Sequence, residues 1–177
     1  MGIFSKIRKP SIAERLGKEA GELAFNQVKI PFALTDYLND VVFNPPKGFF
    51  DDLYIKGYCT SFITSMADVG SAKRGRHWSQ TEKQSFIISA FTSLVGVSNI
   101  SSFMSGAREN SLDANHQLGS LHANTQIKLL FAKNSLDLTE AIFADAIELS
   151  ESSDLYDLGT AFNKLTICQY IESEYLN

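Results

Sequence analysis

The chain has 177 residues, of which 44% are hydrophobic and 20% are charged, and its net charge is −4. This length predicts one domain, since domains usually run about 100–200 residues, and a chain of this size buries roughly 70% of its unfolded surface. The apolar and charged fractions are near the globular averages, which argues against wholesale disorder. The two cysteines, Cys59 and Cys168, lie in apolar stretches without a disulfide or metal-binding pattern, so we expect two buried, reduced thiols.

The first ten residues, MGIFSKIRKP, are basic and lack the apolar segment of a signal peptide, so we expect a cytoplasmic protein. We interpret residues 1–10 as an arm that can be mobile, ahead of a single helical domain over residues 11–177. Three apolar side chains, Ile3, Phe4 and Ile7, lie between the basic ones. This pattern also fits a peripheral, reversible contact with an anionic membrane surface.

The charge is unevenly distributed along the chain. Residues 1–30 contain more basic than acidic side chains, whereas residues 137–177 are strongly acidic and contain one lysine, Lys164. Such a distribution fits two opposite interaction faces, a pairing of the first and last helices, or an ordinary solvated surface.

Capping signals and helical periodicity predict an all-α protein. The capping-box spacing, Ser or Asp followed three residues later by Glu, occurs at Ser11, Ser79 and Asp137. In this motif the first side chain accepts a hydrogen bond from a free N–H of the first helical turn. Gly70 is placed to end a helix, and Pro45 and Pro46 mark a loop. The predicted helices span about 12–27, 32–43, 50–69, 80–96, 112–132, 138–149 and 154–175, with Ser98–Gly106 either a short helix or a continuation.

No alternation of apolar and polar residues predicts a strand, and no repeat of 20–50 residues indicates a solenoid. The sequence therefore predicts a single-domain bundle of about six to eight helices. The stretch Gln84–Ala107 has no charge, but its many hydroxyl side chains make it too polar for a helix that faces lipid, so we expect no integral membrane span. A stripe of small residues at three- and four-residue intervals favours close helix packing and consists of Ser85, Ser89, Thr92 or Ser93, and Gly96. We therefore expect residues 80–96 to form a central, Ser-rich helix of the bundle.

A basic loop is the clearest candidate for a binding site. Residues 70–78, GSAKRGRHW, precede a predicted helix start, where free N–H groups and the helix dipole favour an anion. Arginine offers forked donors suited to phosphate or carboxylate, and an indole can stack on a base or anchor a partner. The candidate ligand-binding residues are Lys73, Arg74, Arg76, His77, Trp78 and Ser79. The alternative is a solvated basic turn whose Trp78 folds back over the bundle.

The other two histidines, His116 and His122, share one predicted helix but are six residues apart, so they do not face a common metal ion. We expect neither a metal site nor a cofactor. Arg108 and His116 flank a predicted helix start, but they are farther apart than the Arg/His pair of helical ribonucleases and lack its apolar surroundings. We interpret both histidines as partly exposed polar positions.

The sequence contains neither a nucleophile elbow nor a glycine-rich phosphate loop, so no motif favours an enzyme. Three interpretations of function remain. The first is a non-catalytic helical module that binds another protein or forms a homo-oligomer. The second is a binder of a phosphate-bearing ligand, a nucleic acid or a lipid headgroup, through the basic loop at residues 73–78. The third is an enzyme with a buried pocket that no motif marks. A deep cavity lined by groups with shifted pKa values would support this third interpretation.

Overall fold

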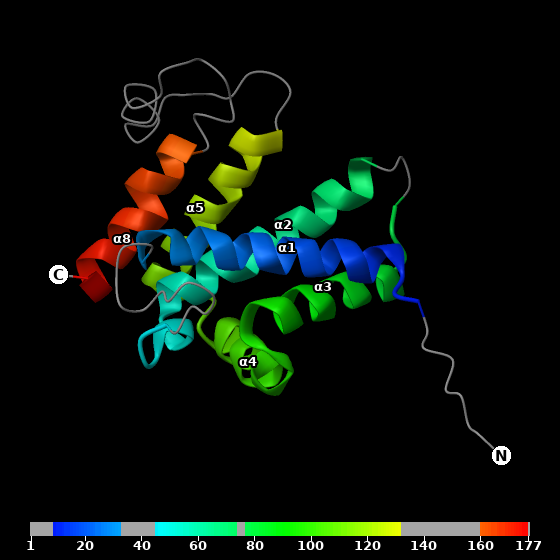
Figure 1. Ribbon diagram of the computed structural model, residues 1–177, viewed down its shortest axis with the longest axis horizontal. Helices are drawn as coiled ribbons and strands as arrows, with labels where there is room; N and C mark the ends of the chain where they lie inside the picture. The colour runs from blue at the N-terminus through cyan, green and yellow to red at the C-terminus, as the bar shows by residue number, and fades with distance from the viewer. Residues whose placement is uncertain (1–8, 33–44, 74–76, 132–159, 177) are drawn as a thin grey trace.

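The computed structural model describes residues 9–32, 45–73, 77–131 and 160–176 (Figure 1). Its longer helices are α1 (Ile12–Lys29), α2 (Leu53–Lys73), α3 (Gln80–Val95), α4 (Ile100–Glu109) and α5 (Ala114–Phe131). Short 3-10 turns adjoin them as η1 (Ile30–Phe32), η2 (Phe49–Asp51) and η3 (Val97–Asn99). Toward the C terminus, α8 (Gln169–Ile171) lies between two π-helical turns, η4 (Lys164–Cys168) and η5 (Glu172–Leu176). The described residues contain no strand, so the prediction of an all-α bundle is confirmed.

Local capping signals determine where α1 and α3 begin, as the sequence predicts. The hydroxyl oxygen of Ser11 accepts a hydrogen bond from the N–H of Glu14, and that of Ser79 accepts one from the N–H of Glu82, both at 3.2 Å. In each case the glutamate carboxylate accepts a hydrogen bond from the backbone N–H of the serine. α3 ends at Gly96, whose φ of 78° is a conformation that residues with a side chain rarely adopt.

The predicted end of α2 at Gly70 is wrong, because the helix continues to Lys73. Gly70 instead faces the indole of Trp78, and a Cβ added there would lie 3.2 Å from the ring carbon Cη2. The absence of a side chain at Gly70 therefore allows the indole ring to pack against α2, and it does not mark the end of the helix. Two predicted helices, over 32–43 and 138–149, lie outside the described residues.

α2 is the central helix of the bundle. It contacts α1, α3, α4 and α5, and every residue from Tyr54 to Cys59 is buried. The prediction that residues 80–96 form the central helix is wrong, because α3 packs mainly on α1 and leaves Gln84 and Ile88 exposed. A hydroxyl-rich helix does not require burial, since its hydroxyls can bond to the helix backbone. Thr92, for example, donates to the carbonyl oxygen of Ile88 at 2.7 Å.

α1 and α3 approach each other closely at small residues (Figure 1). A Cβ added at Gly17 of α1 would collide with the carbonyl oxygen of Phe86, and one added at Gly21 would collide with that of Ala90. The close packing predicted for α3 is therefore present, and glycines of α1 make it possible.

Phenylalanine is the most frequent large side chain in the core, in line with the 13 phenylalanines of the sequence. The buried phenylalanines are Phe32, Phe49, Phe62, Phe86, Phe91, Phe103 and Phe162. Both thiols, Cys59 and Cys168, are free and buried, as expected. Burial raises the pKa of Cys168 to about 11, which keeps this thiol protonated at neutral pH.

The C-terminal helical segment docks on the start of α2 through one carboxylate, Asp52. The hydroxyl groups of Tyr170 and Tyr175 donate to Oδ2 of Asp52 at 2.9 and 3.0 Å. The other oxygen, Oδ1, accepts the N–H of Ile55 at 3.0 Å. The ring of Tyr170 also stacks on that of Tyr54, with centroids 3.9 Å apart. Residues more than a hundred positions apart in the chain are thereby joined at one point.

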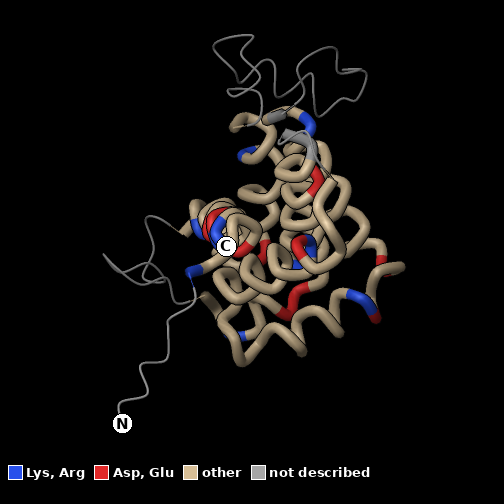
Figure 2. Tube along the Cα trace, turned by 90° about the vertical axis from the view of Figure 1, so that its right-hand side faces the viewer, with Lys and Arg blue, Asp and Glu red and all other residues tan. Residues whose placement is uncertain are grey.

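The chain bends by 109° between α3 and the segment Val97–Glu109, which brings α4 to lie against α2 and α3 (Figure 1). Within the described ranges, no single helix is both long enough and apolar enough to cross a membrane, and only this bent pair taken together meets those criteria. Basic and acidic positions are interspersed over the described elements rather than gathered on opposite faces (Figure 2). Most of the acidic residues after position 136 lie outside the described residues.

Candidate functional site

The structure does not assemble the predicted basic loop into a complete site. Arg74 and Arg76 lie outside the described residues, as does the side chain of Lys73, which is the last residue of α2. His77 is exposed. The prediction that these residues bind an anion therefore stays a prediction.

Trp78 and Ser79 have structural partners. The indole of Trp78 is 6% exposed and packs on the ring of Phe86, with centroids 5.3 Å apart, while its backbone N–H donates to Oγ of Ser71 at 3.1 Å. Trp78 thus folds over the bundle, the alternative that the sequence left open, and its ring cannot stack on a ligand in this conformation. Ser79 is engaged in the capping box of α3 with Glu82.

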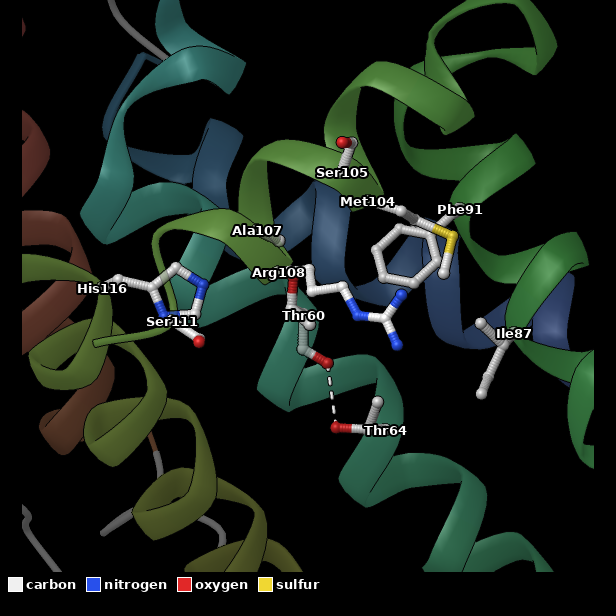
Figure 3. A pocket seen from close by; sticks show the side chains of 10 residues that line it. All are labelled: Thr60, Thr64, Ile87, Phe91, Met104, Ser105, Ala107, Arg108, Ser111 and His116. Atoms are coloured by element: carbon white, nitrogen blue, oxygen red, sulfur yellow. Dashed lines mark hydrogen bonds between the residues drawn. The ribbon is translucent and has the colours of Figure 1, made fainter. Parts of the chain in front are cut away.

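A cavity of about 620 Å³ lies between α2, α3, α4 and the start of α5 (Figure 3). One part of its lining is apolar and consists of Ile87, Phe91, Met104 and Ala107. The other part is polar and consists of Thr60, Thr64, Ser105, Arg108, Ser111 and His116. In the view of Figure 3, His116 and Ser111 stand at one end, Ile87 stands at the other, and the side chain of Arg108 reaches between them.

Helical spacing and the bend before α4 explain how these residues meet. Thr60 and Thr64 are four residues apart on α2, and so are Ile87 and Phe91 on α3, so each pair occupies one helix face. The bend after Gly96 brings α4 over both faces. The cavity is therefore a product of tertiary packing, and no sequence motif marks it.

His116 enters the lining because α5 begins in close contact with α2. A Cβ added at Gly57 of α2 would collide with the carbonyl oxygen of His116. Asp113 caps this end of α5, since its Oδ1 accepts the N–H of His116 at 3.3 Å. The His116 side chain is left 6% exposed. Burial lowers the pKa of His116 below the usual histidine value. The charge of Asp113 opposes this shift, and the charge of Lys56 adds to it. The net pKa is lowered, so the imidazole is neutral at pH 7.

Two unpaired polar atoms distinguish this cavity. Among the residues that the structure describes, the buried side-chain atoms without a hydrogen-bond partner are Oγ1 of Thr60 and Nε2 of His116. Both residues line the cavity. Buried polar atoms in native proteins are nearly always bonded, so an unpaired one calls for an explanation such as a ligand or a bound water.

Both remaining histidines were predicted to be partly exposed, and this prediction is wrong, because His116 and His122 are buried. Nδ1 of His122 lies 2.7 Å from the hydroxyl oxygen of Tyr54, and one turn farther along each helix Tyr58 donates to Gln126. Hydrogen bonds from α2 therefore stabilise the polar face of α5 inside the bundle. As a result, Leu118 and Leu121 are 42% and 52% exposed, although they share the helical spacing of a buried stripe with Thr125 and Leu129.

Arg108 is the charged residue of the cavity lining, and no described carboxylate pairs with it. The expectation that Arg108 and His116 lack apolar surroundings is wrong, since Phe91 and Ala107 line the same cavity. Local spacing hides this arrangement because Phe91 comes from a different helix, α3. No group of three His, Cys, Asp or Glu side chains in the described part of the chain is placed to hold a metal ion.

Comparison of the chain with protein-family models, with curated proteins and with solved structures gave no match. The geometry of the cavity is therefore the basis on which a function is proposed.

Proposed function

We propose that the protein is a binding protein and that its cavity takes an amphipathic small molecule. The observation that carries this proposal is the pair of unpaired buried atoms, Thr60 Oγ1 and His116 Nε2, in the lining of one cavity. A buried polar atom without a partner costs about 1–3 kcal/mol. A ligand with a polar end at these two residues offsets that cost, and its apolar part would contact Ile87 and Phe91.

The size of the cavity supports a small molecule. Ligand pockets usually measure about 300–1,000 Å³, and this cavity measures about 620 Å³. It has room for roughly twenty water-sized groups at about 30 Å³ each. Most of the surface exposed inside the cavity is apolar, although six of the lining residues are polar, and a mainly apolar surface with polar groups is usual for a ligand pocket.

A dye-binding experiment tests this proposal. We expect saturable fluorescence enhancement of 1-anilinonaphthalene-8-sulfonate, an amphipathic dye, on the folded protein. Ala107 is buried outside the main core cluster, so Ala107→Leu should fill the cavity and weaken dye binding. Ala114→Leu, at an exposed position of α5, is the matched control and should bind like the wild type. Equal binding by both variants, or the absence of saturable binding, would contradict the proposal.

A second candidate function is self-association through α5. Leu118 and Leu121 lie one turn apart on this helix and are both exposed, and Leu112, just before it, is 86% exposed. Grouped exposed leucines are typical of contact surfaces. Light scattering over a range of concentrations should show a dimer or larger species that the double variant Leu118→Glu, Leu121→Glu dissociates. Ile88→Glu, at an exposed position of α3, is the control, and a monomer at every concentration would rule the proposal out.

A further inference from the structure

We infer that the ligand of the cavity is a monocarboxylate with a hydrocarbon body and that Arg108 binds its carboxylate. This inference rests on the proposed function and names the class of molecule that the cavity takes. It draws on three observations, which are the charge of the lining, the distribution of polar groups along the cavity and its volume.

The charge of the lining fits a ligand with one negative charge. Arg108 is the charged member of the lining, and within the described ranges it has no carboxylate partner. Its side chain extends into the space between the polar and apolar ends of the cavity (Figure 3). A guanidinium group presents two parallel N–H donors, which match the two oxygens of a carboxylate.

The other basic groups near the cavity do not add a second free charge. The imidazole of His116 is neutral at pH 7, as its burial and the charge of Lys56 require. Lys56 is itself committed to Asp51, with Nζ 3.2 Å from Oδ1 and 3.3 Å from the backbone carbonyl oxygen. One free cation balances a carboxylate, whereas a phosphate monoester has a charge of about −1.5 to −2 at pH 7. The structure thus favours a carboxylate over a phosphate.

The rest of the lining fits the remainder of such a molecule. The hydroxyl of Thr60 lacks a partner and can donate to a carboxylate oxygen held by Arg108. From there the apolar residues Phe91, Ile87 and Met104 line the way for a chain of methylene groups. A carboxylic acid of eight carbons has about ten non-hydrogen atoms, and the cavity has room for roughly twenty water-sized groups.

Titration calorimetry with four ligands that share an eight-carbon chain tests the inference. The ligands are octanoate, octan-1-ol, octyl phosphate and octylamine, and each is used with the full chain at a concentration at which it is fully dissolved and forms no micelles. We expect octanoate to bind about fivefold or more tighter than octan-1-ol, as an ion pair at a partly solvated arginine allows. Octyl phosphate should bind no tighter than octanoate, and octylamine should bind more weakly than both.

Two matched variants assign the preference to Arg108. Arg108→Gln should reduce the affinity for octanoate to that for octan-1-ol and leave the affinity for octan-1-ol unchanged. Arg15→Gln, at an exposed position of α1 outside the cavity, should change neither. Since Arg108 is exposed and pairs with no described carboxylate, its replacement should not impair folding.

The outcomes separate this inference from the proposed function. Equal affinities for octanoate and octan-1-ol, or a tighter complex with octyl phosphate, would overturn the carboxylate assignment and leave a binding cavity in place. A loss of both affinities in Arg108→Gln would also overturn it. If none of the four ligands binds but Ala107→Leu still weakens dye binding, the carboxylate inference is wrong and the proposed binding function stands. If dye binding is also insensitive to Ala107→Leu, the proposed function fails with it.

Discussion

The hydroxyl oxygen of Tyr54 lies 2.7 Å from Nδ1 of His122 in the interior of the bundle. Burial raises the pKa of Tyr54 and lowers that of His122, so the phenol remains protonated while the imidazole remains neutral. The phenol can then donate to Nδ1, and this bond holds α5 against α2. The same pairing makes the stability of the fold dependent on pH.

We expect the free energy of unfolding to fall as the pH decreases below about 6.5, the usual histidine pKa in an unfolded chain. Because the pKa values of His116 and His122 are lowered by folding, the unfolded state binds more protons in this range. The stability is fully present above the unfolded value and is lost as the pH falls toward the folded values. Urea unfolding of the wild type and of His122→Gln at about pH 7.5 and 5.5 should show a smaller loss in the variant. An identical loss in both proteins would count against this role of His122.

Because α1 and α3 lie so close together, we expect a glycine-to-alanine substitution in α1 to destabilise the protein, although the same substitution usually stabilises a helix. Gly→Ala within a helix normally stabilises by about 0.5–1 kcal/mol. At Gly17 the added methyl would collide with the carbonyl oxygen of Phe86, so Gly17→Ala should destabilise by about 1–3 kcal/mol. Lys18→Ala, at an exposed position one residue away, should change the stability by less than about 0.5 kcal/mol. Thermal unfolding measures both, and a stabilised Gly17→Ala would show that the helices are farther apart.

The carboxylate of Asp52 predicts a specific weakness at the C-terminal segment. Asp52→Asn leaves one acceptor oxygen where the carboxylate has two, so the side chain can no longer accept from the tyrosine hydroxyls on one side and from the N–H of Ile55 on the other. The loss should be about 1–3 kcal/mol. Hydrogen exchange should rise first in residues 160–176, while α1 and α3 stay protected. Uniform exchange across all helices would indicate that the segment does not open separately.

The unpaired hydroxyl of Thr60 predicts opposite effects on stability and on binding. Thr60→Val replaces the hydroxyl by a methyl group of similar size and removes a buried polar atom that has no partner. The free protein should be stabilised by up to about 1 kcal/mol, whereas octanoate should bind more weakly. Urea unfolding and calorimetry on the same preparation measure the two effects. Destabilisation would mean that a hydrogen-bonded water already satisfies this hydroxyl.

The sequence predicts the features of this fold that depend on near neighbours. The capping boxes at Ser11 and Ser79 and the loop at Pro45 and Pro46 depend on a few consecutive residues, and each is found as expected. What the sequence cannot supply is which helix faces which. Leu118 and Leu121 have the periodicity of a buried stripe, but the hydroxyls of Tyr54 and Tyr58 turn the polar side of α5 inward.

The candidate site is missed for the same reason. Its residues come from α2, α3, α4 and α5, and they meet only because the chain bends by 109° after α3. The glycines that permit the close helix contacts are visible, since Gly17 and Gly21 are spaced four apart on α1, a spacing typical of tight helix packing. This spacing identifies a contact but does not identify the partner helix.

The joining of Asp52 to Tyr170 and Tyr175 also sets an order of events during synthesis. A nascent chain that has emerged only as far as α5 already contains the central helix, yet it lacks Ile167 and Ile171, which belong to the core. Until this C-terminal segment leaves the ribosome, apolar surface on the start of α2 remains open to water and to chaperones. The core of the described helices is therefore complete only once the segment that contains Ile167 and Ile171 has been made.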